Sequence, residues 1–153
     1  MAAGATEEVR THVLTAHARL RARSAELASE ALRLAHGATD HDVLLRCLVV
    51  ELWANVEATD QLEKRELFPL LAKADAWGSA RVERLRERHA RHEREVCTLA
   101  VQLGEELPAR EAVVRIDGVL RSLLSDLDDE EATSLEPELL DPEDPVIGDQ
   151  TTG

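Results

Sequence analysis

Apolar residues recur at spacings of three, four or seven along most of the chain, and this repeat constrains the fold more than any other feature. It forms a single stripe in each of four stretches, at residues 6–34, 41–74, 80–107 and 108–135. Such spacing places side chains on one face of an α-helix, whereas a half-buried strand needs strict alternation. Breaks are scarce, with 7 Gly and 5 Pro in 153 residues. The sequence therefore predicts an all-α fold.

The breaks between the four stretches contain residues that end or start helices. Gly37 suits the C-cap of the first helix, and Asp40 suits the N-cap of the second. Ser79 suits the N-cap of the third helix, and Pro108 suits the first turn of the fourth. Pro69 lies inside the second stretch, where it either kinks the helix or starts its last turns. Four long helices with short connections favour an up-down-up-down four-helix bundle.

Negative charge is concentrated towards the C-terminus. The chain has 18 Lys and Arg against 31 Asp and Glu, and 11 of these acidic residues lie from Asp126 onwards, where Lys and Arg do not occur. An acidic chain repels phosphate overall, so we expect no nucleic-acid partner. Residues 141–153 combine Pro, Gly and acidic residues, which predicts a disordered acidic tail after a bundle formed by residues 1–140.

Other features of the sequence favour a cytoplasmic protein with no membrane partner. Arg46 and Glu51 interrupt the best apolar run, and about 20 apolar residues are needed to cross a bilayer. The N-terminus lacks the apolar region of a secretion signal. Cys47 and Cys97 fit a reduced protein better than a disulfide framework. The partners that remain are another protein or a second copy of the chain.

Several polar residues stand where the helical stripes should be apolar. Glu63, for example, is seven residues after Val56 and seven before Leu70, in the middle of the second stripe. The other helices have similar exceptions, with one histidine at the flank of the first stripe, two histidines on the third and a glutamate on the fourth. Together these inward-facing candidates are His17, Glu63, His89, His92 and Glu131.

These side chains are candidate metal ligands. Burying a carboxylate or an imidazole costs several kcal/mol unless the group is paired or bound. Carboxylates and imidazoles from facing helices hold iron or manganese in bundle cores. The same residues can instead pair without metal, with His89 and His92 as neutral side chains hydrogen-bonded to Glu63 or Glu131, or with both carboxylates at loose bundle ends. The residues alone leave both alternatives open.

The motif LEKRELFPLL, at residues 62–71, resembles the second helix of the hemerythrin-like (HHE cation-binding) domain, in which Leu-Phe-Pro follows a glutamate. A weaker copy, LDDEE from Leu127 followed by Leu135 and Pro137, resembles the fourth-helix motif of that domain. HARLRA, which begins at His17, resembles its first helix, and RERHARHEREV resembles its third. The resemblance covers about residues 6–140.

This resemblance implies a non-heme di-iron centre used for oxygen binding, iron handling or redox sensing. The ligands that it implies are His17, Glu63, either His89 or His92, and either Glu130 or Glu131. The sequence also departs from the family pattern. Thr59 stands where the family has the histidine of its second helix, and no histidine follows His92. The set of nitrogen ligands is therefore reduced.

Three functions are consistent with this set of residues. The first is iron binding, di-iron or mononuclear, through the reduced ligand set, and the second is a metal-free bundle that acts as a protein-interaction or regulatory module. The third is a metal-dependent oxidising enzyme. The sequence contains no nucleophile–base pair and no Gly-rich phosphate loop of a conventional enzyme, so we expect that the protein is not an enzyme.

Overall fold

Helices make up nearly all of the part of the chain that the structure describes. The computed structural model describes residues 2–37, 41–105 and 107–140, and within these ranges there is no strand. The elements are α1 (Ala2–Ala35), α2 (His41–Leu62), the π-helical turn η1 (Glu63–Leu67), α3 (Phe68–Ala74), α4 (Gly78–Gly104), α5 (Ala109–Ser134) and α6 (Pro137–Leu140). The prediction of an all-α protein is confirmed.

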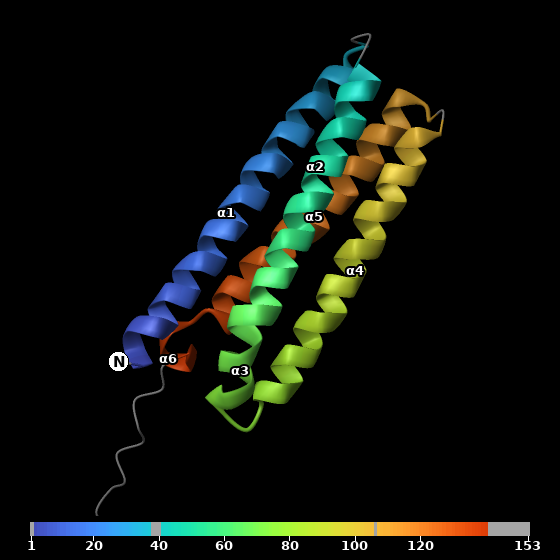
Figure 1. The fold of residues 1–153 in the computed structure, drawn as a ribbon. Coiled ribbons are helices and arrows are strands. Elements are labelled where there is room, and N and C mark those ends of the chain that lie inside the picture. Colours follow the sequence, from blue (N-terminus) through green and yellow to red (C-terminus); the bar gives the residue numbers. More distant parts are fainter. Residues whose placement is uncertain (1, 38–40, 106, 141–153) are drawn as a thin grey trace, which may run out of the picture.

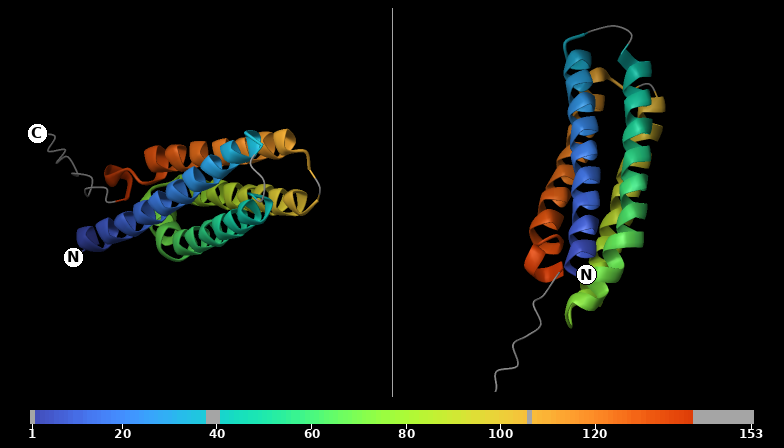
Figure 2. Two further views of the ribbon diagram at one scale, coloured as in Figure 1. Left: turned by 90° about the horizontal axis from the view of Figure 1, so that it is seen from above. Right: turned by 60° about the vertical axis from the view of Figure 1, so that its left-hand side comes forward.

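Four long segments lie side by side, and α2, η1 and α3 together form the second of them (Figure 1). Consecutive segments run in opposite directions, as the further views in Figure 2 also show. α1 contacts α2 and α5, and α4 contacts the same two helices. The segments therefore surround a shared interior, and residues that lie at the same height on different helices can meet there.

The prediction that Gly37 ends the first helix is confirmed, and the prediction that Ser79 is the N-cap of the third is wrong. Gly37 has a φ of 74° and ends α1, and its N–H donates a hydrogen bond to the carbonyl oxygen of Leu34. Asp40 lies outside the described residues. Ser79 is not an N-cap, because α4 already begins at Gly78. A Cβ atom on Gly78 would lie 2.1 Å from the carbonyl oxygen of Leu71, so this close approach requires glycine.

Pro69 starts the last turns of the second segment, as one of the two predicted alternatives states. It occupies the first turn of α3, and the preceding turn is the π-helix η1, in which the N–H of Phe68 donates to the carbonyl oxygen of Glu63. Proline has no N–H, and its ring clashes with the carbonyl group four residues earlier. The wider turn accommodates the proline, and it leaves Glu63 and Leu67 both buried.

Buried apolar residues form two clusters, one towards each end of the molecule. The upper cluster, at the end of the α1–α2 connection, consists of Leu20, Leu27, Ala31, Leu45, Val49, Leu52, Val56, Val96, Leu99, Ile116, Leu120, Leu123 and Leu127. The lower cluster consists of Val13, Leu67, Phe68, Leu71, Val82, Leu85, Leu135 and Leu140. On every long segment, buried polar residues separate the two clusters. This polar layer consists of His17, Thr59, Glu63, His89, His92 and Glu130.

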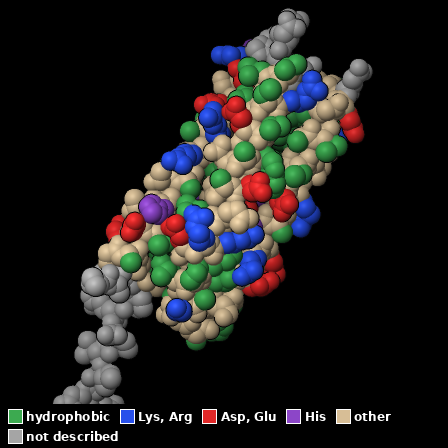
Figure 3. Space-filling view, viewed as in Figure 1, with side chains coloured by type: hydrophobic (Ala, Val, Ile, Leu, Met, Phe, Trp, Pro, Cys, Tyr) green, Lys and Arg blue, Asp and Glu red, His purple; other side chains and the backbone are tan. Residues whose placement is uncertain are grey.

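The surface carries charged side chains of both signs interspersed with apolar ones (Figure 3). Within the described ranges, no helix is both long enough and apolar enough to span a membrane. Cys47 and Cys97 are exposed and unpaired. The predicted acidic tail, residues 141–153, lies outside the described residues.

Candidate metal centre

Each of the four long segments supplies one ionisable side chain to the centre of the polar layer. His17 comes from α1, Glu63 from η1, His89 from α4 and Glu130 from α5, and all four are at most 5% exposed. They continue the apolar stripes of their helices. On α5, for example, Ile116, Leu123 and Glu130 follow one another at intervals of seven residues. The periodicity that builds the core therefore also brings these polar groups together.

Glu63 contacts two histidines of the polar layer, one through each of its carboxylate oxygens. Its Oε1 lies 2.9 Å from His17 Nε2, and its Oε2 lies 2.6 Å from His89 Nε2. Burial alone would raise the pKa of Glu63, but the hydrogen bonds from the two histidines outweigh burial and lower this pKa. Glu63 is therefore an ionised carboxylate held between two imidazoles, with one oxygen facing each of them.

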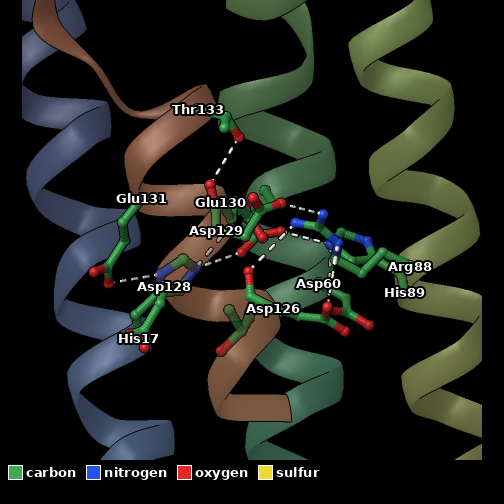
Figure 4. A network of polar contacts seen from close by, with 12 residues as sticks. His17, Asp60, Arg88, His89, Asp126, Asp128, Asp129, Glu130, Glu131 and Thr133 are labelled. Carbon is green, nitrogen blue, oxygen red and sulfur yellow. Dashed lines mark hydrogen bonds and ion pairs between the residues drawn. The ribbon is translucent and has the colours of Figure 1, made fainter. Parts of the chain in front are cut away.

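Glu130 points towards His17, and one of its carboxyl oxygens has no hydrogen-bond partner (Figure 4). Its Oε1 lies 3.9 Å from His17 Nε2 and has no hydrogen-bond partner. Burial, then the charge of Glu63, and then a hydrogen bond with Glu63 raise the pKa of Glu130 well above its ordinary value. Only three buried side-chain polar atoms lack a partner in the described part of the chain, and two of them belong to Glu130 and His89.

Asp60 joins the layer from α2, and the sequence analysis missed it. Its Oδ1 lies 3.5 Å from His89 Nε2, and its side chain is 14% exposed. Burial is the main reason that the pKa of Asp60 is raised to about 7, with the charge of Glu63 acting in the same direction and His89 opposing it. Asp60 precedes Glu63 by three residues and therefore shares its helix face, which is the signal that could have identified it.

The centre contains two groups of ligand atoms that share Glu63. His17, Glu63 and Glu130 form one group, and Asp60, Glu63 and His89 form the other. Within each group, the ligand atoms lie within 4.8 Å of one another. Imidazole nitrogens with carboxylate oxygens are a donor set that suits iron or manganese. A carboxylate with one oxygen in each group suits a bridge between two cations.

The two groups differ in their access to solvent. Asp60 and His89 line a surface pocket of about 290 Å³ between α2 and α4, with Trp53 and Lys64 also in its wall. The His89 ring stacks on Phe68, with 5.6 Å between the ring centroids. His17, in contrast, is fully buried. The layer therefore borders a surface pocket on the side of His89 and is closed at His17.

His92 is buried, but it belongs to neither ligand group. Its Nε2 lies 2.6 Å from Asp126 Oδ2, and Asp126 also accepts a hydrogen bond from Arg91. Burial lowers the pKa of His92 even though the hydrogen bond to Asp126 opposes this shift. Both histidines of α4 thus face inward, and only His89 contacts Glu63.

Glu130, not Glu131, points into the centre, so the expectation that Glu131 faces inward is wrong. The Glu131 side chain is 27% exposed, whereas Glu130 is 2% exposed. A helix with 3.6 residues per turn alternates spacings of three and four along its buried face. After Leu127 the next buried positions are Glu130 and Ser134, so the step is three residues and not the expected four.

Thr59, which the resemblance places where the hemerythrin-like family has a histidine, makes a hydrogen bond within its own helix. Its side chain is buried, and its Oγ1 donates a hydrogen bond to the carbonyl oxygen of Asn55 at 2.8 Å.

Comparison of the chain with protein-family models, with curated proteins and with solved structures gives no significant match. Any assignment of function therefore depends on the motif residues and on the geometry of the polar layer.

Proposed function

We propose that the protein is a hemerythrin-like four-helix bundle that binds iron, or a similar divalent transition metal, in its polar layer. The observation that carries this proposal is the unpartnered Oε1 of Glu130, which faces His17 and Glu63. A buried carboxyl oxygen without a hydrogen-bond partner costs free energy. A cation between these three residues removes that cost, and the buried positions around it exclude water.

The ligand set is richer in oxygen than the family pattern. It has two imidazoles, from His17 and His89, and three carboxylates, from Asp60, Glu63 and Glu130. Asp60 adds a carboxylate on α2, the segment in which Thr59 replaces a histidine. When bound, iron would supply the oxygen-binding or redox chemistry that the resemblance implies. Held by these residues, it would serve oxygen, iron or redox sensing, with no enzymatic turnover.

A second candidate function is that of a metal-free interaction or regulatory module. His17, Glu63 and His89 already satisfy one another's hydrogen bonds in part, which a metal-free layer requires. Apolar side chains on the upper half of the molecule are also 42% to 65% exposed, and a protein partner or a second copy of the chain would cover them. These residues are Leu32, Val43, Leu44, Val50, Val101 and Val114.

Metal content per chain separates the two candidates. Untagged protein from iron-supplemented medium is expected to contain about one or two metal ions per chain, with ultraviolet–visible bands from iron. Glu130→Gln should remove most of this metal. Glu111→Gln is the matched control, because Glu111 is an exposed glutamate on the same helix. Substoichiometric metal in the wild-type chain, with a featureless spectrum, would contradict metal binding and favour the interaction module.

A further inference from the structure

We propose that Glu131 and Arg21 form a positioning pair that orients His17 towards the metal position, while the adjacent Glu130 binds the metal. This inference rests on the proposed function and assigns different roles to two neighbouring carboxylates. Figure 4 shows that Glu130 and Glu131 lie on opposite sides of the His17 ring. Consecutive residues of a helix point about 100° apart, so Glu130 and Glu131 cannot both direct their carboxylates to the same position.

The two nitrogens of His17 face different carboxylates. Nδ1 lies 3.1 Å from Glu131 Oε1, whereas Nε2 lies 2.9 Å from Glu63 Oε1. A metal ion that binds Nε2 takes its lone pair, so the proton of the neutral ring must then be on Nδ1. Glu131 Oε1 is in place to accept a hydrogen bond from that proton. His17 is fully buried, so water does not readily replace this acceptor.

Arg21 holds the Glu131 carboxylate in this orientation. It lies one helical turn after His17 on α1, and its two terminal nitrogens donate to Glu131 at 2.6 Å and 3.0 Å. A guanidinium that binds both carboxylate oxygens fixes the plane of the carboxylate as well as its position. Glu131 Oε1 is therefore held beside His17 Nδ1 as a hydrogen-bond acceptor.

The position of Glu131 also argues against a role as a metal ligand. Its Oε1 already contacts both Arg21 and His17 Nδ1. It belongs to neither group of converging ligand atoms in the described chain. Acceptors that hold the second nitrogen of a ligating histidine typically change metal affinity by about 10- to 100-fold when they are removed. Removal of a ligand instead abolishes binding at its position.

The test is a titration of the full chain with Zn²⁺, which is diamagnetic and allows NMR of the histidine rings. Glu131→Leu is expected to weaken zinc binding about 10- to 100-fold at unchanged stoichiometry. Arg21→Leu should weaken it less, because Glu131 remains. Asp128→Asn is the matched control, since the amide oxygen of asparagine can keep the hydrogen bond that Asp128 accepts from Arg21 at 2.8 Å, and the affinity should be unchanged. Circular dichroism verifies that every variant is folded.

A second readout separates positioning from general structural damage. Long-range ¹H–¹⁵N spectra of the zinc-loaded wild-type chain should show His17 with its proton on Nδ1. In Glu131→Leu this Nδ1 proton should exchange faster with solvent, and Glu131→Gln, which keeps an acceptor oxygen, should partly restore its protection. Wild-type affinity and an unchanged His17 spectrum in Glu131→Leu would overturn the positioning role, and so would loss of stoichiometry equal to that of Glu130→Gln. If the wild-type chain takes up no zinc, the proposed function itself fails.

Discussion

The upper apolar cluster and the polar layer lie at successive levels of the same helices, but the cluster stabilises the fold and the unpartnered oxygen in the layer destabilises it. On α5, Leu123 and Glu130 are seven residues apart and almost equally buried, at 1% and 2% exposed. Burying a leucine stabilises the fold by about 1.5–3 kcal/mol, whereas a buried carboxylate with an unpartnered oxygen costs free energy. The apolar cluster explains why the chain folds. The unpartnered oxygen of the polar layer does not help folding, and we propose that it serves metal binding instead.

The largest effect on the free energy of unfolding is expected at Glu63, the residue of the polar layer that contacts two histidines. Glu63→Leu should destabilise the metal-free protein by about 3–5 kcal/mol, because both His17 and His89 lose their acceptor while they remain buried. Chemical denaturation in the presence of a chelator measures this difference. From the sequence alone, an unliganded Glu63 would be replaceable by leucine without loss. A neutral or stabilising result would show that the contacts to the two histidines are not important for stability.

Leu123→Ala is the matched change in the apolar cluster. It should cost about 3 kcal/mol, through the lost burial and the cavity left behind, and should leave metal affinity unchanged. Denaturation with and without added Fe²⁺ tests both parts. A change in metal affinity comparable to that of Glu130→Gln would mean that the two regions are not independent.

A smaller effect, about 1.4 kcal/mol per pH unit for each proton released, is expected in the pH dependence of metal binding. The pKa of Asp60 is raised to about 7, and that of Glu130 lies well above its ordinary value. Below these values protons occupy the carboxylates and compete with the cation. Zinc affinity should therefore rise from pH 6 to pH 8. Calorimetric titrations across this range measure the slope, and an affinity that is constant or falls would contradict these two carboxyl groups as ligands.

The smallest effect concerns Ser24, the third residue with an unpartnered buried polar atom in residues 2–37, 41–105 and 107–140. It lies on α1 between Leu20 and Leu27 of the upper cluster, away from the ligand groups. Ser24→Ala should stabilise the protein by about 0.5–1 kcal/mol, because an unsatisfied hydroxyl is removed. The gain should be the same with and without metal. A gain that appears only in the metal-free protein would place Ser24 in the binding site.

The helices could be predicted from the sequence because heptad-spaced Leu and Val residues define one buried face on each of them. Which polar residues of the buried faces meet at the centre was harder to predict, because periodicity alone does not decide it. After Leu127, steps of three and four residues are equally regular, and only the line from Ile116 through Leu123 indicates Glu130. The inward-facing His89 and His92 could not be separated, because contact with Glu63 depends on the relative height of two helices. Ser79 failed as a cap because the close approach of Gly78 to Leu71 starts α4 earlier.

Thermal unfolding of the wild-type chain and of Glu130→Leu, each with and without Fe²⁺ under anaerobic conditions, tests the central claim most directly. Without metal, Glu130→Leu should unfold at a higher temperature, because a buried carboxyl group with an unpartnered oxygen is gone. With metal at about 100 times its Kd, the wild-type chain should gain about 2.7 kcal/mol, the variant should gain little, and the order should reverse. The same order under both conditions would contradict the account of the polar layer as a metal site.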